Sequence, residues 1–257
     1  MSVLKSLILA FSMFSRIPMP KAEWNEKNMK YMMAFFPLVG AAIGILLMGW
    51  GELAASVKMS RILFSCGVTL IPIAVTGGIH LDGFCDTADA LSSHAAPEKK
   101  REILKEPRIG SFAVISVCCY FLLYFSLCYE FVISKGSLIM LICIHILSRV
   151  LSSFSVILLP SDNNKGTLSA FATASDKTIV CVLLIGMLIC CEITAVLISP
   201  VGGGLILLNG AVCFVLLKQM AQKAFEGMSG DLAGFFLQIN ELASIACIIF
   251  AQKLDFM

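Results

Sequence analysis

Apolar runs long enough to cross a membrane dominate this sequence and leave few folds open to it. A helix that crosses the hydrocarbon core of a bilayer needs about 20 mostly apolar residues. The predicted spans are residues 32–49, 62–79, 109–133, 137–159, 178–198 and 201–217, with 234–250 as a weaker seventh. Only 14% of the residues are charged and 58% are hydrophobic, which is too little charge to cover a soluble fold. We therefore predict an all-α integral membrane bundle of six or seven transmembrane helices, forming one domain over residues 1–257.

The N-terminal apolar stretch, residues 3–15, is too short to span a bilayer with confidence, and the sequence SRIPMP stops it. It is predicted to be a short interfacial or re-entrant helix. In the first predicted span, Gly40 and Gly44 lie four residues apart. They predict a face of small residues where another helix approaches closely.

Basic residues in the short loops predict the orientation of the bundle, because cytoplasmic loops of membrane proteins are enriched in Lys and Arg. Alternate loops carry fourteen and four basic residues, with Arg149 set aside as intramembrane. The fourteen include Lys5, Arg16, Lys99, Lys105 and Arg108. The chain is expected in the cytoplasmic (inner) membrane, with the loop after the second span facing the cytoplasm.

That loop begins with GGIHLDGFCDTADAL, which concentrates acid in an otherwise apolar chain. On a helix, Asp82, Asp86 and Asp89 would lie within a sector of about 60° on one face. Carboxylates this close together repel one another, so the arrangement favours a bound cation or protonation. An oxygen-only ligand set suits Mg²⁺ better than zinc. The alternative is a solvated helix face. Gly83 within the stripe indicates close approach by a ligand or a backbone.

Cations and a further acid follow in other cytoplasmic loops. Lys105 and Arg108 in KKREILKEPRIGSF could offset the charge of a diphosphate, or contact lipid headgroups instead. Asp231 in GMSGDLAG could cap the helix that follows it or approach the first aspartates. Asn240 and Glu241 stand in an apolar run, where polar groups usually pair or line a cavity.

Several of these motifs together resemble the cobalamin synthase family, the adenosylcobinamide-GDP ribazoletransferases. The motifs are FSMFSRIPMP, FFPLVGAAIG, GGIHLDGFCDTADAL, EPRIGSF, GMSGDLAG and INEL, in order from about Phe11 to Glu241. The resemblance implies Mg²⁺-dependent transfer of adenosylcobinamide phosphate from adenosylcobinamide-GDP to α-ribazole or its 5′-phosphate, with release of GMP. Similar proteins tend to carry a more basic A-R-x-E-G-L-G pattern where this chain has Lys165 and Gly166.

With that reaction in view, the sequence yields a set of site hypotheses. Asp82, Asp86 and Asp89 are the expected Mg²⁺ ligands. His80 or Asp89 would take the proton of the ribazole 5′-hydroxyl, His80 only if the backbone bends at Gly77-Gly78; otherwise His80 is an interfacial capping residue. Arg108 is the third catalytic candidate. The substrate-binding candidates are Arg16, Lys105, Arg149, Asp231 and Asn240.

The expected partners are these small-molecule substrates and membrane lipid, with no nucleic acid, and a homo-oligomer stays open. Two other functions are alternatives. A lipid-directed CDP-alcohol phosphotransferase would show D-G-x-x-A-R, whereas Asp82-Gly83 is followed by Phe84, Cys85 and Asp86. A cation transporter would need acids deep within the spans. Glu192 and the His145–Arg149 pair are the candidates for that interpretation.

Overall fold

The computed structural model describes residues 2–161 and 167–254, and the described chain is helical, with no β-sheet. Six of its helices are long and apolar enough to cross a membrane, and a bent pair, α4 and α5, adds a seventh span if counted as one. The twelve helices are α1 Ser2–Phe14, α2 Glu26–Met29, α3 Met32–Ser56, α4 Arg61–Thr76, α5 Ile79–Ser92, α6 Pro97–Ile103, α7 Ser111–Glu130, α8 Lys135–Leu158, α9 Thr167–Ala174, α10 Lys177–Ile198, α11 Pro200–Ala224 and α12 Gly230–Leu254. The predicted fold class is confirmed.

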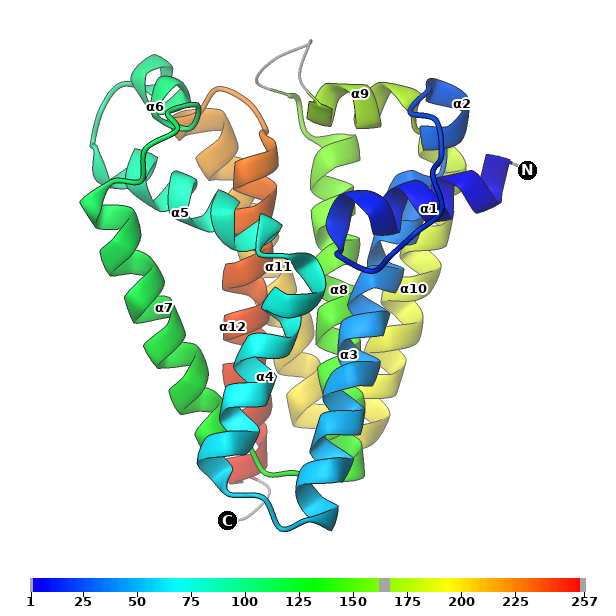
Figure 1. Ribbon diagram of the computed structural model, residues 1–257, viewed down its shortest axis with the longest axis vertical. Coiled ribbons are helices and arrows are strands. Elements are labelled where there is room, and N and C mark those ends of the chain that lie inside the picture. The colour runs from blue at the N-terminus through cyan, green and yellow to red at the C-terminus, as the bar shows by residue number, and fades with distance from the viewer. Residues whose placement is uncertain (1, 162–166, 255–257) are drawn as a thin grey trace.

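The long helices form a bundle, with short helices gathered at one end of it (Figure 1). Helices α1, α2, α5, α6 and α9 lie at this end, here called the α5 end, and the C-terminal end of α12 lies at the other. Helix α1 lies across the bundle rather than along it, as expected for an interfacial helix, and buries Leu9 and Ala10. The weak seventh span is a full helix, α12.

Helix α8 lies at the centre of the bundle, and its close neighbour is α3. A Cβ atom on Gly44 would lie 2.5 Å from the Cα of Ile142, and one on Gly40 would overlap the carbonyl of His145. The small-residue face predicted from Gly40 and Gly44 is therefore confirmed, and α8 is the helix that packs on it. The outer helices instead expose aliphatic side chains, such as Leu122, Val182, Leu197 and Leu208, as lipid-facing helices do.

The second predicted span needs a correction, because the helix does not run through to Ile79. Gly77 and Gly78 both adopt left-handed backbone conformations, with φ of 68° and 84°, which glycine reaches without steric cost. Helix α4 ends at Thr76, and α5 starts at Ile79 in a direction 96° away. As a result α5 lies across the α5 end of the bundle, outside the spans (Figure 1).

Other predicted boundaries also shift, and α3 continues to Ser56 rather than ending near Gly49. Helix α11 continues to Ala224 rather than ending near Leu217, and α7 begins at Ser111 instead of Ile109. A count of apolar residues measures the thickness of the hydrocarbon core, whereas a helix continues until its backbone hydrogen bonds end. The start of α11 is sharply defined. Ser199 caps the helix by accepting a hydrogen bond from the Gly202 N–H at 3.0 Å, and Pro200 occupies the first turn.

Candidate functional site

Helix α5 carries the three aspartates on a common side, as the sequence pattern predicts. Burial raises the pKa of Asp86 to about 6, and the carboxylates of Asp82, Asp231 and Asp89 add to that rise, in this order. The carboxylates are thus close enough to influence one another through a partly desolvated region. Asp82 itself is exposed, and Asp86 and Asp89 are half-buried. An acidic cluster with an opening to solvent lies at the α5 end of the bundle.

Asp231 reaches this cluster because α12 crosses directly against α5. A Cβ atom on Gly83 would lie 2.8 Å from both the Cα and the carbonyl oxygen of Asp231. One on Gly234 would lie 2.9 Å from the carbonyl oxygen of His80. Of the two expectations for Gly83, a ligand or a backbone, the structure shows the backbone of α12 in close approach.

The start of α12 bears on the two roles expected for Asp231. The cap belongs to Ser229, whose Oγ accepts a hydrogen bond from the Leu232 N–H at 3.2 Å. Asp231 lies in the first turn of the helix. Because Ser229 performs the capping, the structure favours the other expectation, in which Asp231 joins the aspartates of α5.

Asp89 has a second neighbour, the N-terminus of α7. Gly110 is the residue that precedes α7, and a Cβ atom there would overlap the Asp89 carboxylate. A carboxylate at a helix N-terminus is favoured by the helix dipole. Asp89 is therefore held against the end of the EPRIGSF motif, while the predicted choice between ligand and base stays a prediction.

The described residues contain no group of three or more His, Cys, Asp or Glu side chains already arranged to hold a metal ion. Mg²⁺ does not require such a cage, since it commonly uses one or two carboxylates and fills its other positions with water and substrate phosphates. Asp82 and Asp86, one turn apart on α5, fit that requirement. The three-aspartate shell that includes Asp89 stays a prediction.

His80 lies beside the aspartates but faces an apolar cavity. Its side chain is 6% exposed and packs near the rings of Phe14 and Phe36, at centroid distances of 6.2 and 5.5 Å. The bend at Gly77-Gly78, on which its predicted role as a base depends, is present. Its Nε2 has no hydrogen-bond partner among the residues that the structure describes. The choice between a base and an interfacial capping residue stays a prediction.

The cavity at His80 has a volume of about 190 Å³ and is lined by residues from six helices. Asp82 and Asp231 lie at its wall with His80. Its other lining residues are mostly apolar and come from α1, α3, α5, α8, α9 and α12: Met13, Phe14, Met33, Phe36, Ile79, Ser152, Val156, Leu168, Phe171, Gly230, Ala233 and Gly234. The cavity thus adjoins the acidic cluster of Asp82, Asp86, Asp89 and Asp231, here called the acidic rim, and it has an aromatic interior.

The predicted cationic residues take different positions around this site. Arg16 is exposed, and its side chain lies over Gly77. Its backbone N–H donates a hydrogen bond to the Val75 carbonyl at 2.7 Å. Lys105 and Arg108 are exposed in the connection between α6 and α7, with Arg108 two residues before Gly110. All three belong to segments at the α5 end (Figure 1).

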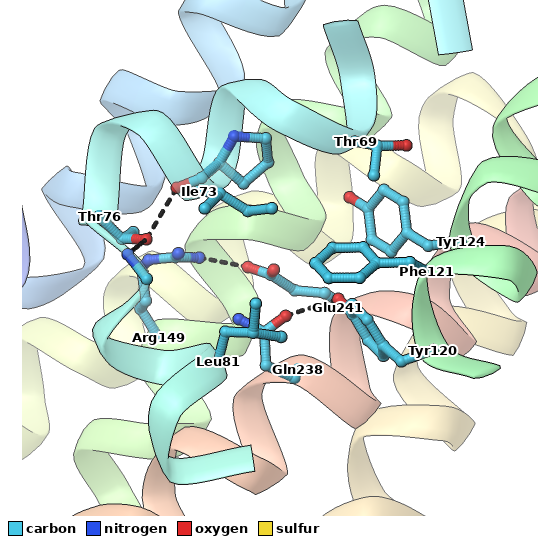
Figure 2. Close-up of a pocket in the computed structure, with 12 residues that line it drawn as sticks. Thr69, Ile73, Thr76, Leu81, Tyr120, Phe121, Tyr124, Arg149, Gln238 and Glu241 are labelled. Atoms are coloured by element: carbon cyan, nitrogen blue, oxygen red, sulfur yellow. Dashed lines mark hydrogen bonds and ion pairs between the residues drawn. The ribbon is translucent and has the colours of Figure 1, made fainter. Parts of the chain in front are cut away.

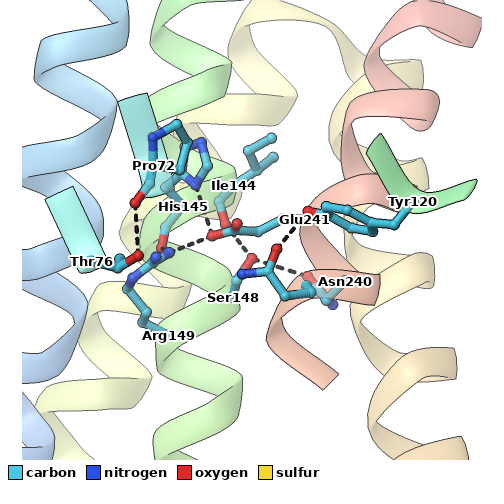
Figure 3. Close-up of polar contacts among 10 residues, drawn as sticks. Pro72, Thr76, Tyr120, Ile144, His145, Ser148, Arg149, Asn240 and Glu241 are labelled. Atoms are coloured by element: carbon cyan, nitrogen blue, oxygen red, sulfur yellow. Dashed lines mark hydrogen bonds and ion pairs between the residues drawn. The ribbon is translucent and has the colours of Figure 1, made fainter. Parts of the chain in front are cut away.

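Arg149 lies deeper, inside the bundle, where it pairs with Glu241 of α12 (Figure 2). Both side chains are almost fully buried. His145 Nδ1 lies 2.8 Å from the same Glu241 oxygen, and the Arg149 guanidinium also donates to the His145 carbonyl at 2.8 Å. Figure 3 shows these groups converging on Glu241 from α8. The buried charges are paired, as charges at this depth must be.

Asn240 also belongs to this buried network rather than to the acidic rim. Its side-chain oxygen accepts a hydrogen bond from Ser148 Oγ at 3.3 Å (Figure 3). Arg149 also lies near one of the phenylalanines of the cavity, with its guanidinium carbon 5.9 Å from the centre of the Phe36 ring. Substrate binding by Arg149 and Asn240 stays a prediction, and the structure gives both of them a structural role.

Sequence reasoning missed the aromatic interior of the cavity. Phe14 and Phe36 fall within FSMFSRIPMP and FFPLVGAAIG, yet nothing in the pattern separates them from ordinary membrane-facing Phe. Phe171 lies on α9, an element that the span count does not predict. Lys165 and Gly166 lie outside the described residues.

Comparison with known proteins places the chain in a family. The family model described as Cobalamin-5-phosphate synthase matches residues 6–249. The adenosylcobinamide-GDP ribazoletransferase of Lachnoclostridium phytofermentans is 38% identical over 98% of this chain and 96% of its own. That of Clostridium botulinum strain Alaska E43 is 30% identical over 96% and 98%, and that of Clostridioides difficile is 29% identical over 95% and 97%. No solved structure matches. From its motifs, its membrane bundle and these matches together, the chain belongs to the cobalamin-5-phosphate synthase family, transferases of cobalamin biosynthesis.

Proposed function

We propose that this enzyme transfers adenosylcobinamide phosphate from adenosylcobinamide-GDP to α-ribazole or its 5′-phosphate, releases GMP and requires Mg²⁺. The relatives named above are ribazoletransferases acting on adenosylcobinamide-GDP. The observation that carries the proposal is the gathering of Asp82, Asp86 and Asp231 on one rim, with exposed cations on neighbouring segments. A diphosphate substrate needs both features, anionic ligands for a divalent cation and positive charge for the remaining oxygens.

The reaction exchanges one phosphorus–oxygen bond for another. An acceptor hydroxyl oxygen attacks the phosphorus attached to the corrinoid side chain, and the bond from that phosphorus to the bridging oxygen breaks. GMP leaves with the bridging oxygen, and the hydroxyl proton passes to a base. No oxidant or further reactant is needed, so catalysis consists of positioning and charge stabilisation.

The acceptor oxygen requires a revision of the sequence-based hypothesis, which used the 5′-hydroxyl. The family description names a 5-phosphate product. A 5′-oxygen that already carries a phosphate group has no proton to lose and cannot attack. The acceptor is therefore another hydroxyl of the ribose.

Each residue of the candidate site then has a proposed role. Asp82 and Asp86 hold Mg²⁺, which when bound neutralises diphosphate oxygens and makes GMP a better leaving group. Lys105, Arg108 and Arg16 attract the diphosphate and offset the charge on GMP. Asp231 orients the acceptor from the α12 side. His80 or Asp89 accepts the hydroxyl proton, and both lie next to the carboxylates that would hold the metal.

The proposed location is the cytoplasmic membrane, with the α5 end in the cytoplasm. The loops at this end carry most of the basic residues, as the positive-inside rule requires. Membrane lipid is the second proposed partner class, because aliphatic side chains cover the outer helices. A homo-oligomer stays a prediction.

One assay tests the function directly. Purified protein in lipid nanodiscs is given adenosylcobinamide-GDP and α-ribazole, and both GMP and the corrinoid product are quantified with Mg²⁺ or with excess EDTA. We expect equimolar GMP and product with Mg²⁺ and neither with EDTA. Product formation at an unchanged rate in EDTA would overturn the Mg²⁺ requirement, and absence of both products under every condition would overturn the proposed transfer.

A further inference from the structure

The cavity at His80 differs from the acidic rim in chemistry, and the roles proposed above leave its interior unused. Three phenylalanine rings line it, from Phe14, Phe36 and Phe171, and Phe14 contacts both of the other two, with ring centroids at 4.1 and 6.3 Å. Phe36 is 2% exposed and Phe171 is 5% exposed. Such a lining binds flat, apolar, aromatic groups in preference to charged ones.

The dimensions of the cavity select among the parts of the two substrates. Its volume of about 190 Å³ lies below the roughly 300–1,000 Å³ of pockets that take a drug-sized ligand. A corrin ring is therefore much too large. A guanine base would need several hydrogen-bond partners around its edge, and the cavity interior offers mainly Phe, Met, Val and Leu side chains. A fused bicyclic base bearing only methyl groups matches both the size and the polarity.

The polar groups of the cavity stand where the sugar of such a ligand would lie. His80, with its unpartnered Nε2, and the carboxylate-bearing Asp82 and Asp231 line the same cavity as the phenylalanines. A nucleoside whose base enters the aromatic interior would place its ribose at this boundary. The ribose hydroxyls would then face the rim where the diphosphate is proposed to bind, which is the geometry that the transfer requires.

We propose that this cavity is the binding site for the dimethylbenzimidazole base of α-ribazole, and that its walls determine which base the enzyme accepts. This inference rests on the proposed function. It assigns Phe14, Phe36, Phe171 and Val156 to substrate selection, and His80 Nε2 to a hydrogen bond with the acceptor nucleoside. The corrinoid part of the donor stays outside the cavity.

Substitution of Val156 tests the assignment, because this residue lines the cavity from α8 and has an aliphatic side chain with no proposed part in the chemistry. Val156→Phe fills part of the space, so we expect the KM for α-ribazole to rise at least tenfold while the KM for adenosylcobinamide-GDP stays unchanged. The α-riboside of unsubstituted benzimidazole lacks the two methyl groups and should lose much less. Leu151→Phe is the matched control, since Leu151 lies on the same helix but lines a different cavity.

The fluorescence of the benzimidazole base gives a second readout that needs no turnover. We expect α-ribazole to bind the wild-type protein and the Leu151→Phe variant alike, and the Val156→Phe variant at least tenfold more weakly. If Val156→Phe does not yield a monodisperse protein, Ser152→Val makes a smaller addition to the same wall, with the same expected direction.

The outcomes separate this inference from the proposed function. Wild-type turnover with an unchanged α-ribazole KM in the Val156→Phe or Ser152→Val variant would overturn the base site and leave the function standing. Equal losses for both nucleosides would also overturn it, because a general distortion does not discriminate by two methyl groups. Binding of α-ribazole with the expected losses, but without GMP release from the donor, would support the cavity and sink the function.

Discussion

At the residue scale, substitution of aspartates in the acidic rim distinguishes a metal site from a solvated helix face. Asp82→Asn and Asp86→Asn each remove an anionic oxygen ligand, so we expect turnover to fall to the detection limit. Folding should persist, because losing one of several repelling carboxylates does not destabilise the metal-free protein. Product formation in nanodiscs measures the first effect and the unfolding temperature the second. Glu98→Gln, an exposed acid on α6, is the matched control.

The same experiment distinguishes the role of Asp89 from the roles of the other aspartates. An Asp89→Asn variant that still shows Mg²⁺-dependent stabilisation but turns over slowly would identify Asp89 as the base. Near-normal activity of Asp82→Asn, Asp86→Asn and Asp89→Asn across a Mg²⁺ titration would mean that the stripe is a solvated face. The chemistry would then have to be sought around Asp231.

The raised pKa of Asp86 predicts how stability depends on pH without Mg²⁺. Its pKa in the folded protein is about 6, above the ordinary value of 3.8. The folded state therefore keeps this proton at pH values where the unfolded chain has lost it. The resulting stabilisation is complete below the unfolded pKa and is lost as pH rises through about 6. In EDTA, the wild-type protein should unfold at a higher temperature at about pH 5 than at about pH 7.5.

The Asp86→Asn variant is the control for this pH effect. Its unfolding temperature should change less between the two pH values, since the carboxyl group that titrates is gone. A pH dependence equal to that of the wild type would assign the effect to other groups. Adding Mg²⁺ to the wild type should reverse the trend, because metal binding competes with the proton for the carboxylate.

At the scale of elements, the crossing of α5 and α12 positions the rim. A Cβ atom on Gly83 would lie 2.8 Å from the backbone of Asp231, so Gly83→Ala forces the two helices apart. Overpacking of this kind costs about 1–3 kcal/mol. We expect a lower unfolding temperature and a loss of turnover, since Asp231 moves with α12. Gly204→Ala on α11, where an added Cβ meets nothing within 4 Å, should preserve both properties.

The buried pair between α8 and α12 makes a second prediction at this scale. Arg149 and Glu241 are buried together, so Glu241→Gln leaves the guanidinium charge without its counter-ion. Breaking one partner of a buried pair costs about 3–5 kcal/mol. The double variant Arg149→Met, Glu241→Gln should recover part of this loss, as measured by thermal unfolding in nanodiscs. A double variant less stable than Glu241→Gln alone would indicate that Arg149 is stabilised mainly by other contacts.

At the scale of the whole molecule, the distribution of basic loops predicts which end faces the cytoplasm. A reporter fused after Lys105, in the connection from α6 to α7, should be cytoplasmic, and one fused after Lys135, at the start of α8, should be external. Paired reporters, one active only in the cytoplasm and one only outside it, measure both positions. The opposite pattern would place the acidic rim on the side where GDP-activated substrates are not made.

The sequence alone determined the fold class, the membrane bundle and the sharing of one helix face by the three aspartates. These follow from local properties, namely the length of the apolar runs and the spacing of Asp82, Asp86 and Asp89. The short motifs also led to the family. Each of these properties can be recognised within one stretch of the chain, so no knowledge of distant contacts is needed.

Only the tertiary structure decided which distant residues share the site. The approach of Asp231 to Gly83, the pairing of Arg149 with Glu241 and the convergence of Phe14, Phe36 and Phe171 on His80 join segments that lie far apart in the chain. In a membrane bundle every helix is apolar, so hydrophobic pattern does not specify which faces meet. That choice depends on small residues that allow close approach and on buried polar groups that must find partners. Both conditions are met only by the packed bundle as a whole.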